Sequence, residues 1–212
     1  MDHSDAPGDV RQLERDLRAI FGGRLQSLAT YGGGAHTLAI VETLTVADLR
    51  ACAERAAGWH DAHLATPLLL AAHEFESALD AFPLEFGAIL ANHTVVFGKA
   101  PFDSLNVDRA DLRRAIEVQA RSQLIHLRES YVETRGNANG VALLIVDSAP
   151  AFKALVESVR RLDPAYDAGA NGKAVVALAG THDLASSEAE RILPGYVEAL
   201  ERLVKYVDQW TA

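Results

Sequence analysis

A link of only five residues, Gly32 to His36, separates two apolar β-like runs and limits how the chain can fold. The runs cover residues 25–31 and 37–44, and the link begins with three consecutive glycines. Parallel strands need a crossover of a dozen or more residues, so these two runs must pair antiparallel. Glycine adopts the positive φ of a tight turn at no steric cost. The sequence therefore predicts a β-hairpin closed by a glycine turn.

Helical and strand patterns surround this hairpin. Apolar residues recur at helical spacing over residues 10–21 and again over 46–60. On the second helix we expect an inward face made of Val46, Leu49, Cys52, Ala53 and Ala56. Further along, 66–71 and 94–98 are β-like, 73–81 is a short helix that ends before Pro83, and 84–90 is either strand or helix.

After residue 106 the pattern becomes entirely helical. Asp108 is a good N-cap, and apolar residues then recur every three or four positions up to Tyr131. Further helices are expected over 140–162, with a kink at Pro150, over 172–180 and over 196–210. The fold class is thus α+β: a loose tail (1–9), a mixed α/β domain (10–106) and an all-helical bundle (107–212).

Composition limits the function classes. The net charge is −9, so broad attraction to nucleic acid or to an anionic membrane is not expected. No apolar run approaches the roughly 18 residues that span a bilayer, and the single cysteine excludes an intrachain disulfide. We therefore expect a cytoplasmic protein.

The order of these elements gives a resemblance to a known group. Helix, strand, glycine turn, strand, helix and strand, followed by a helical bundle, resembles bacterial nucleotidyltransferase-like proteins of the antibiotic-nucleotidyltransferase and polymerase-β type. Residues 82–132 and 196–210 are also similar to segments of such proteins. The resemblance implies a nucleotidyltransferase-like domain at residues 10–106.

In active members of that superfamily a Gly-Ser turn cradles nucleotide phosphates, and paired carboxylates on the following strand hold Mg²⁺. A third carboxylate on a later strand helps to activate the attacking hydroxyl. In this chain the serine position is Gly33, and the positions of the paired acids are Ala35 and Thr37. Neutral side chains cannot replace the oxygen ligands that Mg²⁺ requires. Glu85 roughly matches the third acid and is the one weak catalytic candidate.

The resemblance therefore implies a degenerate member that has lost Mg²⁺-dependent nucleotidyl transfer and serves as a binding or scaffold protein. We expect no metal site and no cofactor. Gly32, Gly33 and Gly34 form a remnant ligand-binding turn, because backbone amides of glycine turns attract anions. A small ligand or a protein partner is expected in a cleft between the two parts of the chain. The apolar last helix, which ends at Trp210, is compatible with a homodimer interface or with burial inside one chain.

Two alternatives stay open. The first is an active, divergent nucleotidyltransferase that uses Mg²⁺ and a nucleoside triphosphate to modify a small-molecule or protein hydroxyl. It requires acids from outside the expected motif, for instance Glu85 with Glu42 or Asp103. The second is a HEPN-like nuclease or toxin-antitoxin-associated module, because Arg121 and His126 fit the Arg-x4-His pattern of such ribonucleases.

Overall fold

The structure, a computed structural model, describes residues 8–99, 102 and 105–211. The chain divides into two compact units, Met1–Val107 and Asp108–Ala212. The first unit contains a four-stranded mixed sheet with helices, and the second unit is helical. The predicted α+β class is confirmed at this level. The predicted loose tail covers residues 1–9, of which 1–7 lie outside the described residues, while α1 begins at Gly8.

The first unit is built around the predicted hairpin. Its elements in chain order are α1 (Gly8–Phe21), η2 (Gly22–Arg24), β1 (Leu25–Tyr31), η3 (Gly32–Gly34), β2 (His36–Val41), α2 (Val46–Asp61), β3 (Leu68–Ala71), α3 (Ala72–Ala81), α4 (Pro83–Ala91) and β4 (His93–Gly98). The strand order in the sheet is β3-β2-β1-β4. β1 pairs antiparallel with both β2 and β4, and β2 pairs parallel with β3. The antiparallel hairpin is therefore confirmed.

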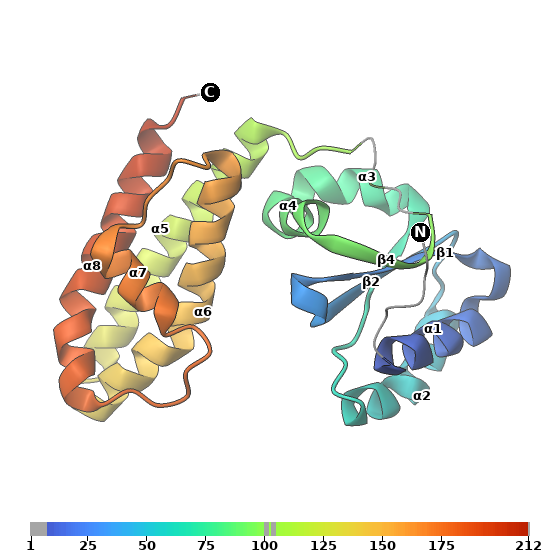
Figure 1. The fold of residues 1–212 in the computed structure, drawn as a ribbon, viewed down its shortest axis with the longest axis horizontal. Helices are drawn as coiled ribbons and strands as arrows, with labels where there is room; N and C mark the ends of the chain where they lie inside the picture. Colours follow the sequence, from blue (N-terminus) through green and yellow to red (C-terminus); the bar gives the residue numbers. More distant parts are fainter. Residues whose placement is uncertain (1–7, 100–101, 103–104, 212) are drawn as a thin grey trace. The chain divides into compact units, whose positions relative to one another are not determined.

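Helices cover both faces of this sheet. Leu28 of β1 lies opposite Ala39 of β2, and both belong to the buried cluster that contains the apolar residues of α1 and α2. Successive side chains of a strand alternate between faces, so the neighbouring pair, Ala29 and Leu38, points to the other face. Figure 1 shows α1 and α2 on one side of the sheet and α3 and α4 on the other.

The inward face predicted for α2 is wrong in part. Val46 is 64% exposed and Leu49 is 45% exposed, whereas Cys52 is buried as predicted. The inward residues of α2 are Asp48, Cys52 and Trp59. Sequence periodicity misplaced this face because it assigned a carboxylate, Asp48, to the surface. Burial, with the nearby charge of Asp48, raises the pKa of the Cys52 thiol.

The Asp48 carboxylate can be buried because it accepts several hydrogen bonds. Its carboxylate accepts two hydrogen bonds from the Arg24 guanidinium, at 2.8 and 2.7 Å. It also accepts the Thr45 backbone amide at 2.9 Å, while the Thr45 hydroxyl accepts the Asp48 amide, so the two residues form a capping box at the start of α2. The Arg24 and Thr45 hydrogen bonds hold the pKa of Asp48 well below its usual range.

A second buried carboxylate, Asp16, joins α1 to α2. It accepts the indole N–H of Trp59 at 3.0 Å and the amide of Gln12 at 3.0 Å. The Arg55 guanidinium also donates to it, at 3.2 Å. Since Trp59 is almost fully buried, the hydrogen bond to Asp16 satisfies an indole N–H that water cannot reach.

Residues 84–90, left open between strand and helix, form most of α4. Pro83 is the first residue of this helix, a position that proline favours because its missing N–H is not needed there. Pro83 therefore starts α4 with only Phe82 between it and the end of α3. Phe86 and Ile89 of α4 are buried, and the Phe86 ring contacts the Phe75 ring of α3 edge-on at 5.5 Å between centroids.

The second unit is a helical bundle of α5 (Arg109–Glu133), α6 (Ala138–Leu162), α7 (Gly169–Ala177) and α8 (Ser186–Gln209). Asp108 caps α5 as predicted, accepting the amide of Ala110 at 2.8 Å. Tyr131, where the apolar pattern of this helix ends, is 43% exposed. Helix α8 begins ten residues earlier than predicted, and it continues through Pro194, as α6 continues through Pro150.

Helix α6 is long and apolar enough to cross a membrane by length and composition. In the structure it packs against α5, α7 and α8, with Ile145, Phe152 and Val159 among its buried residues. This is the arrangement of a core helix in a bundle. The cytoplasmic location stays a prediction.

A buried hydrogen-bond network connects α5, α6 and α8. The Gln123 amide of α5 donates to the Tyr196 hydroxyl of α8 at 3.0 Å, and that hydroxyl donates to the Ser148 carbonyl of α6 at 3.3 Å. Tyr196 is fully buried. The Gln123 side-chain oxygen has no hydrogen-bond partner among the described residues. The network thus fixes the positions of three helices relative to one another and leaves one acceptor unmatched.

We predict that Asp48→Ala lowers the free energy of unfolding of the first unit by about 1–2 kcal/mol at pH 7, the usual cost of losing a helix cap. Because the folded pKa of Asp48 is depressed, its contribution is complete above the ordinary carboxyl pKa, near ~4, and is lost as pH falls below it. Urea unfolding at pH 7 and pH 3, followed by Trp59 fluorescence in a Trp210→Phe background, measures both effects.

Asp61→Ala is the matched control, because Asp61 is exposed at the other end of α2. Its effect should stay within about 0.5 kcal/mol at either pH. A cost of Asp48→Ala that is equally large at pH 3 and pH 7 would contradict the assigned role of the Asp48 charge.

We also predict that Tyr196→Phe destabilises the second unit by about 1–2 kcal/mol. The ring contacts are kept in this variant, but the Gln123 amide loses its closest acceptor. Thermal unfolding measured by circular dichroism tests this, with Tyr131→Phe as the exposed control on the same bundle. An unchanged melting temperature for Tyr196→Phe would show that the network adds no stability.

Candidate functional site

The glycine turn forms the end of the β1–β2 hairpin. Gly32, Gly33 and Gly34 have φ values of 60°, 71° and 92°, and all three are exposed. Ala35, which follows, returns to the right-handed helical region. Residues of opposite handedness in succession turn neighbouring backbone N–H groups toward one side, which creates an anion-binding concavity. The three glycines of the predicted turn are thus exposed, while the Ala35 amide donates to the Gly32 carbonyl within the turn.

Two aromatic rings flank this turn. Tyr31, the last residue of β1, lies opposite His36 of β2 and also opposite His93 of β4. The Tyr31 and His36 rings contact each other, with 5.4 Å between centroids. The imidazole of His36 also approaches Gly32 so closely that a Cβ at Gly32 would lie 3.1 Å from it. The backbone at Gly32 therefore packs closely against the His36 ring and leaves little room for a side chain.

Glu85 belongs to this same end of the sheet. It is an exposed residue in the first turn of α4, so of the two structures left open for residues 84–90 the helix is the one observed. Burial, and secondly the nearby negative charge of Glu85, raise the pKa of Tyr31. Glu85 is thus near enough to influence Tyr31, the residue that precedes the glycine turn.

Thr37, one of the two positions where the resemblance implies a metal-binding acid, does not lie on the same face of the sheet as Glu85. Thr37 is buried, and its hydroxyl has no hydrogen-bond partner among the described residues. Thr37 pairs with Thr30, one residue away from the Tyr31–His36 pair, so its side chain points to the opposite face of the sheet. Glu85 therefore lies on one face, and Thr37 faces the other.

The further acids proposed for an active enzyme are not gathered at the turn either. Glu42 follows the last residue of β2, and its backbone amide bonds the Arg24 carbonyl at 2.8 Å. The six residues of β2 separate it from the turn, which corresponds to about 20 Å along an extended strand. Asp103 lies outside the described residues.

Arg121 and His126 are exposed and engaged in separate contacts on α5. The Arg121 guanidinium binds Glu117 at 3.0 Å and Asp208 at 3.1 Å, whereas the His126 imidazole lies 3.1 Å from Glu129. Five residues along a helix turn two side chains roughly 140° apart around its axis. The geometry within this chain therefore does not bring the proposed nuclease pair together.

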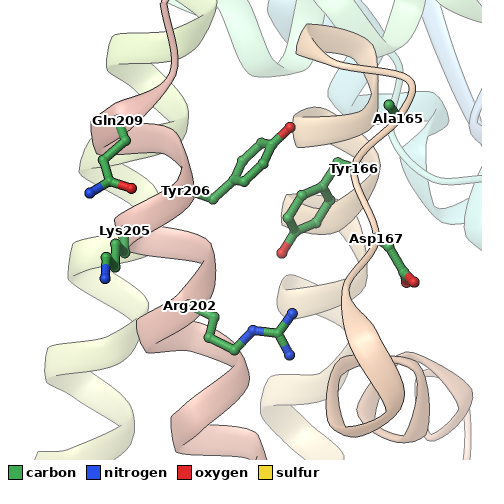
Figure 2. Close-up of a pocket in the computed structure, with 7 residues that line it drawn as sticks. All are labelled: Ala165, Tyr166, Asp167, Arg202, Lys205, Tyr206 and Gln209. Atoms are coloured by element: carbon green, nitrogen blue, oxygen red, sulfur yellow. The ribbon is translucent and has the colours of Figure 1, made fainter.

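A pocket in the second unit was not predicted from the sequence. We call it the Tyr166 pocket; it has a volume of about 350 Å³ and is lined by Ala165, Tyr166, Asp167, Arg202, Lys205, Tyr206 and Gln209 (Figure 2). Its residues come from the segment between α6 and α7 and from α8, which are separated by more than thirty positions in the sequence. The lining includes two tyrosines and two cations, Arg202 and Lys205, and no pattern in the sequence connects them.

No protein-family model matches the chain, and a search of curated proteins finds no match. In the part of the chain that the structure describes, His, Cys, Asp and Glu side chains form no group of three or more that could hold a metal ion. The resemblance to nucleotidyltransferase-like proteins therefore stays a prediction, as do the homodimer and a ligand in a cleft between the two parts of the chain. Trp210 does have a partner within its own chain, since the Arg109 guanidinium lies 5.1 Å from the centre of its ring.

We predict that Gly32→Ala costs about 1–2 kcal/mol of stability, the usual penalty for a side chain in the left-handed region, with an added contact against His36. Gly33→Asn is the matched variant, because nothing lies within 4 Å of a Cβ at Gly33 and asparagine tolerates this conformation. Urea unfolding should rank the wild type and Gly33→Asn close together and Gly32→Ala clearly below them. Equal stability of all three proteins would contradict the close fit of the turn to the ring pair.

Proposed function

We propose that this chain is a nucleotidyltransferase-like binding protein that no longer carries out Mg²⁺-dependent nucleotidyl transfer. The order of α1, β1, glycine turn, β2, α2 and β3, followed by a helical unit, supports the proposal, because the resemblance rests on this order. The observation that carries it is the chemistry at the end of the hairpin. The turn keeps its exposed glycines, while Ala35, just before β2, and the buried Thr37 of β2 stand in place of acids.

The end of the hairpin suits a ligand with a phosphate group. The backbone amides of Gly33 and Gly34 supply hydrogen-bond donors to an anion. The half-buried Tyr31 adds a phenol that stays protonated at neutral pH, because its pKa is raised, and His36 adds an exposed imidazole. Glu85 accepts hydrogen bonds and suits a hydroxyl or amino group of the same ligand. We therefore propose a phosphate-bearing small molecule of the nucleotide class as the ligand of this site.

Transfer chemistry would need more than these groups. A nucleotidyl transfer develops negative charge on phosphate oxygens and on the leaving group, which clustered carboxylates and Mg²⁺ normally offset. A single glutamate can accept a proton, but it leaves that charge uncompensated. Binding without turnover is the function that these residues support best.

The proposal predicts that radiolabelled nucleoside triphosphates with Mg²⁺ or Mn²⁺ give no transfer to the protein or to small hydroxyl acceptors. The matched comparison is Glu85→Gln, which keeps the shape of the side chain and removes its charge. Transfer by the wild type that Glu85→Gln abolishes would overturn the proposal in favour of an active enzyme.

Binding itself is measured separately, by titrating ¹⁵N-labelled protein with ATP without metal. We expect saturable shifts of the Gly32, Gly33 and Gly34 amides, while the amide of Gly136, in a turn of the second unit, stays unchanged. Shifts that are absent from the hairpin, or spread evenly over both turns, would remove the assigned ligand site.

A further inference from the structure

The Tyr166 pocket lies in the second unit, apart from the proposed site at the glycine turn. One wall is the segment that joins α6 to α7, and the other is α8 (Figure 2). In this view Arg202 and Tyr206 extend from α8 toward the segment, whereas Lys205 and Gln209 extend toward the other side of the helix. The groups that face into the pocket between the two walls are therefore Arg202, Tyr206 and Tyr166.

Asp163, the residue that ends α6, fixes the two walls relative to each other. Its carboxylate accepts the Tyr206 hydroxyl at 2.5 Å and the Ala165 backbone amide at 2.9 Å. The Tyr206 ring in turn contacts the Tyr166 ring, with 4.7 Å between centroids. The pocket is thus held by contacts within the chain, and the Tyr206 hydroxyl is already used as a donor.

Asp167, the second carboxylate of the pocket, also has hydrogen-bond and ionic partners within the chain. It accepts the backbone amide of Gly169 at 3.0 Å and forms an ion pair with Lys173 at 3.0 Å. These contacts lower the pKa of Asp167, as the Tyr206 hydroxyl lowers the pKa of Asp163. Both carboxylates therefore stay ionised, and both have partners other than Arg202.

Arg202 is a cation of the pocket that has no ionic partner in the part of the chain that the structure describes. Within the described residues, neither a hydrogen bond nor an ion pair engages its guanidinium. The guanidinium lies against Gly169, where a Cβ would be only 2.6 Å from the Nη1 atom. A glycine at this position therefore leaves room for the Arg202 guanidinium, which no described residue neutralises.

The Tyr166 hydroxyl is the neutral donor beside this cation. The Tyr166 side chain is 8% exposed, and no hydrogen bond among the described residues occupies its hydroxyl. Burial raises the pKa of Tyr166 to about 12, although Arg202 acts in the opposite direction, so the phenol remains protonated at neutral pH. Figure 2 shows this hydroxyl and the Arg202 guanidinium directed into the space between α8 and the segment.

The local charge has the opposite sign to that of the whole protein. Four cations lie at or next to the pocket lining: Arg160, Lys173, Arg202 and Lys205. Two carboxylates, Asp163 and Asp167, lie beside the pocket, in a chain whose net charge is −9. An unpaired guanidinium beside a hydroxyl donor in a concave, locally positive site has the chemistry of an anion receptor, because arginine forks onto phosphate or carboxylate oxygens.

We propose that the Tyr166 pocket binds the oxyanion group of a small molecule, a phosphate or a carboxylate, with Arg202 as the charged donor and Tyr166 as the neutral donor. The volume of about 350 Å³ is near the lower end for ligand pockets, so the occupant is a small metabolite. The proposal concerns different residues from those of the glycine turn and does not depend on the function proposed there.

The test is a titration of the ¹⁵N-labelled full-length protein with inorganic phosphate and, separately, with acetate, against chloride at matched ionic strength. We expect saturable shifts of amides in residues 164–169 and along α8 from 201 to 206. The affinity expected for so small a probe is on the order of millimolar. The anion that binds with the higher affinity identifies the group that the pocket prefers. A response to both no greater than that to chloride would overturn the proposal.

Variants assign the binding to the named donors. Arg202→Gln should weaken the preferred anion roughly tenfold or more, since a hydrogen bond to a charged group is lost. Arg202→Lys should give an intermediate affinity, and Tyr166→Phe should weaken binding a few-fold while keeping the ring. Arg191→Gln, an exposed arginine on the same helix, is the control and should leave binding unchanged. Wild-type affinity in both Arg202→Gln and Tyr166→Phe would refute the assignment, and shifts at Gly32–Gly34 should be the same in all variants.

Discussion

The backbone pairing of β1 is the interaction on which the first unit depends. β1 is hydrogen-bonded to β2 on one side and to β4 on the other, and the five-residue link to β2 leaves the chain no parallel alternative. This pairing sets which residues share a face. It places Tyr31 between His36 and His93, and it turns Thr37 away from them. The chemistry at the glycine turn follows from this register, because a shift by one residue would exchange the two faces.

Two buried carboxylates then attach the helices to one another and to the chain beside the sheet. Asp16 bonds α1 to Trp59 of α2, and Asp48 bonds the first turn of α2 to Arg24, immediately before β1. A buried charge is costly unless it is paired, and both carboxylates are paired here. Hydrophobic contacts supply the bulk of the core, while these ion pairs specify how α2 lies against it.

The sequence predicted most of the elements because their signals are local. The glycine turn, α1 and the N-cap Asp108 each depend on neighbouring residues, and all three are confirmed. The errors have two causes, a partner that is distant in the sequence and a proline that lies inside a helix. The inward face of α2 includes Asp48 because Arg24 neutralises it, and the start of α8 was missed because Pro194 lies in its interior.

The same distinction applies to the candidate sites. Glu85 was chosen from the sequence, but its helix and its place near Tyr31 depend on how α4 packs on the sheet. Arg202 gave no signal of its own, since a single arginine on a surface helix is ordinary in sequence. Only the fold brings it against Gly169, where no described residue forms an ion pair with it.

The burial of Cys52 has a practical consequence. It is the single cysteine of the chain, it lies in the core between α2 and the sheet, and burial raises its thiol pKa. A thiolate-specific reagent can therefore modify the native protein only when this core opens. The rate of that modification therefore reports how often the core of the first unit opens. The second unit contains no cysteine, so it does not contribute to the signal.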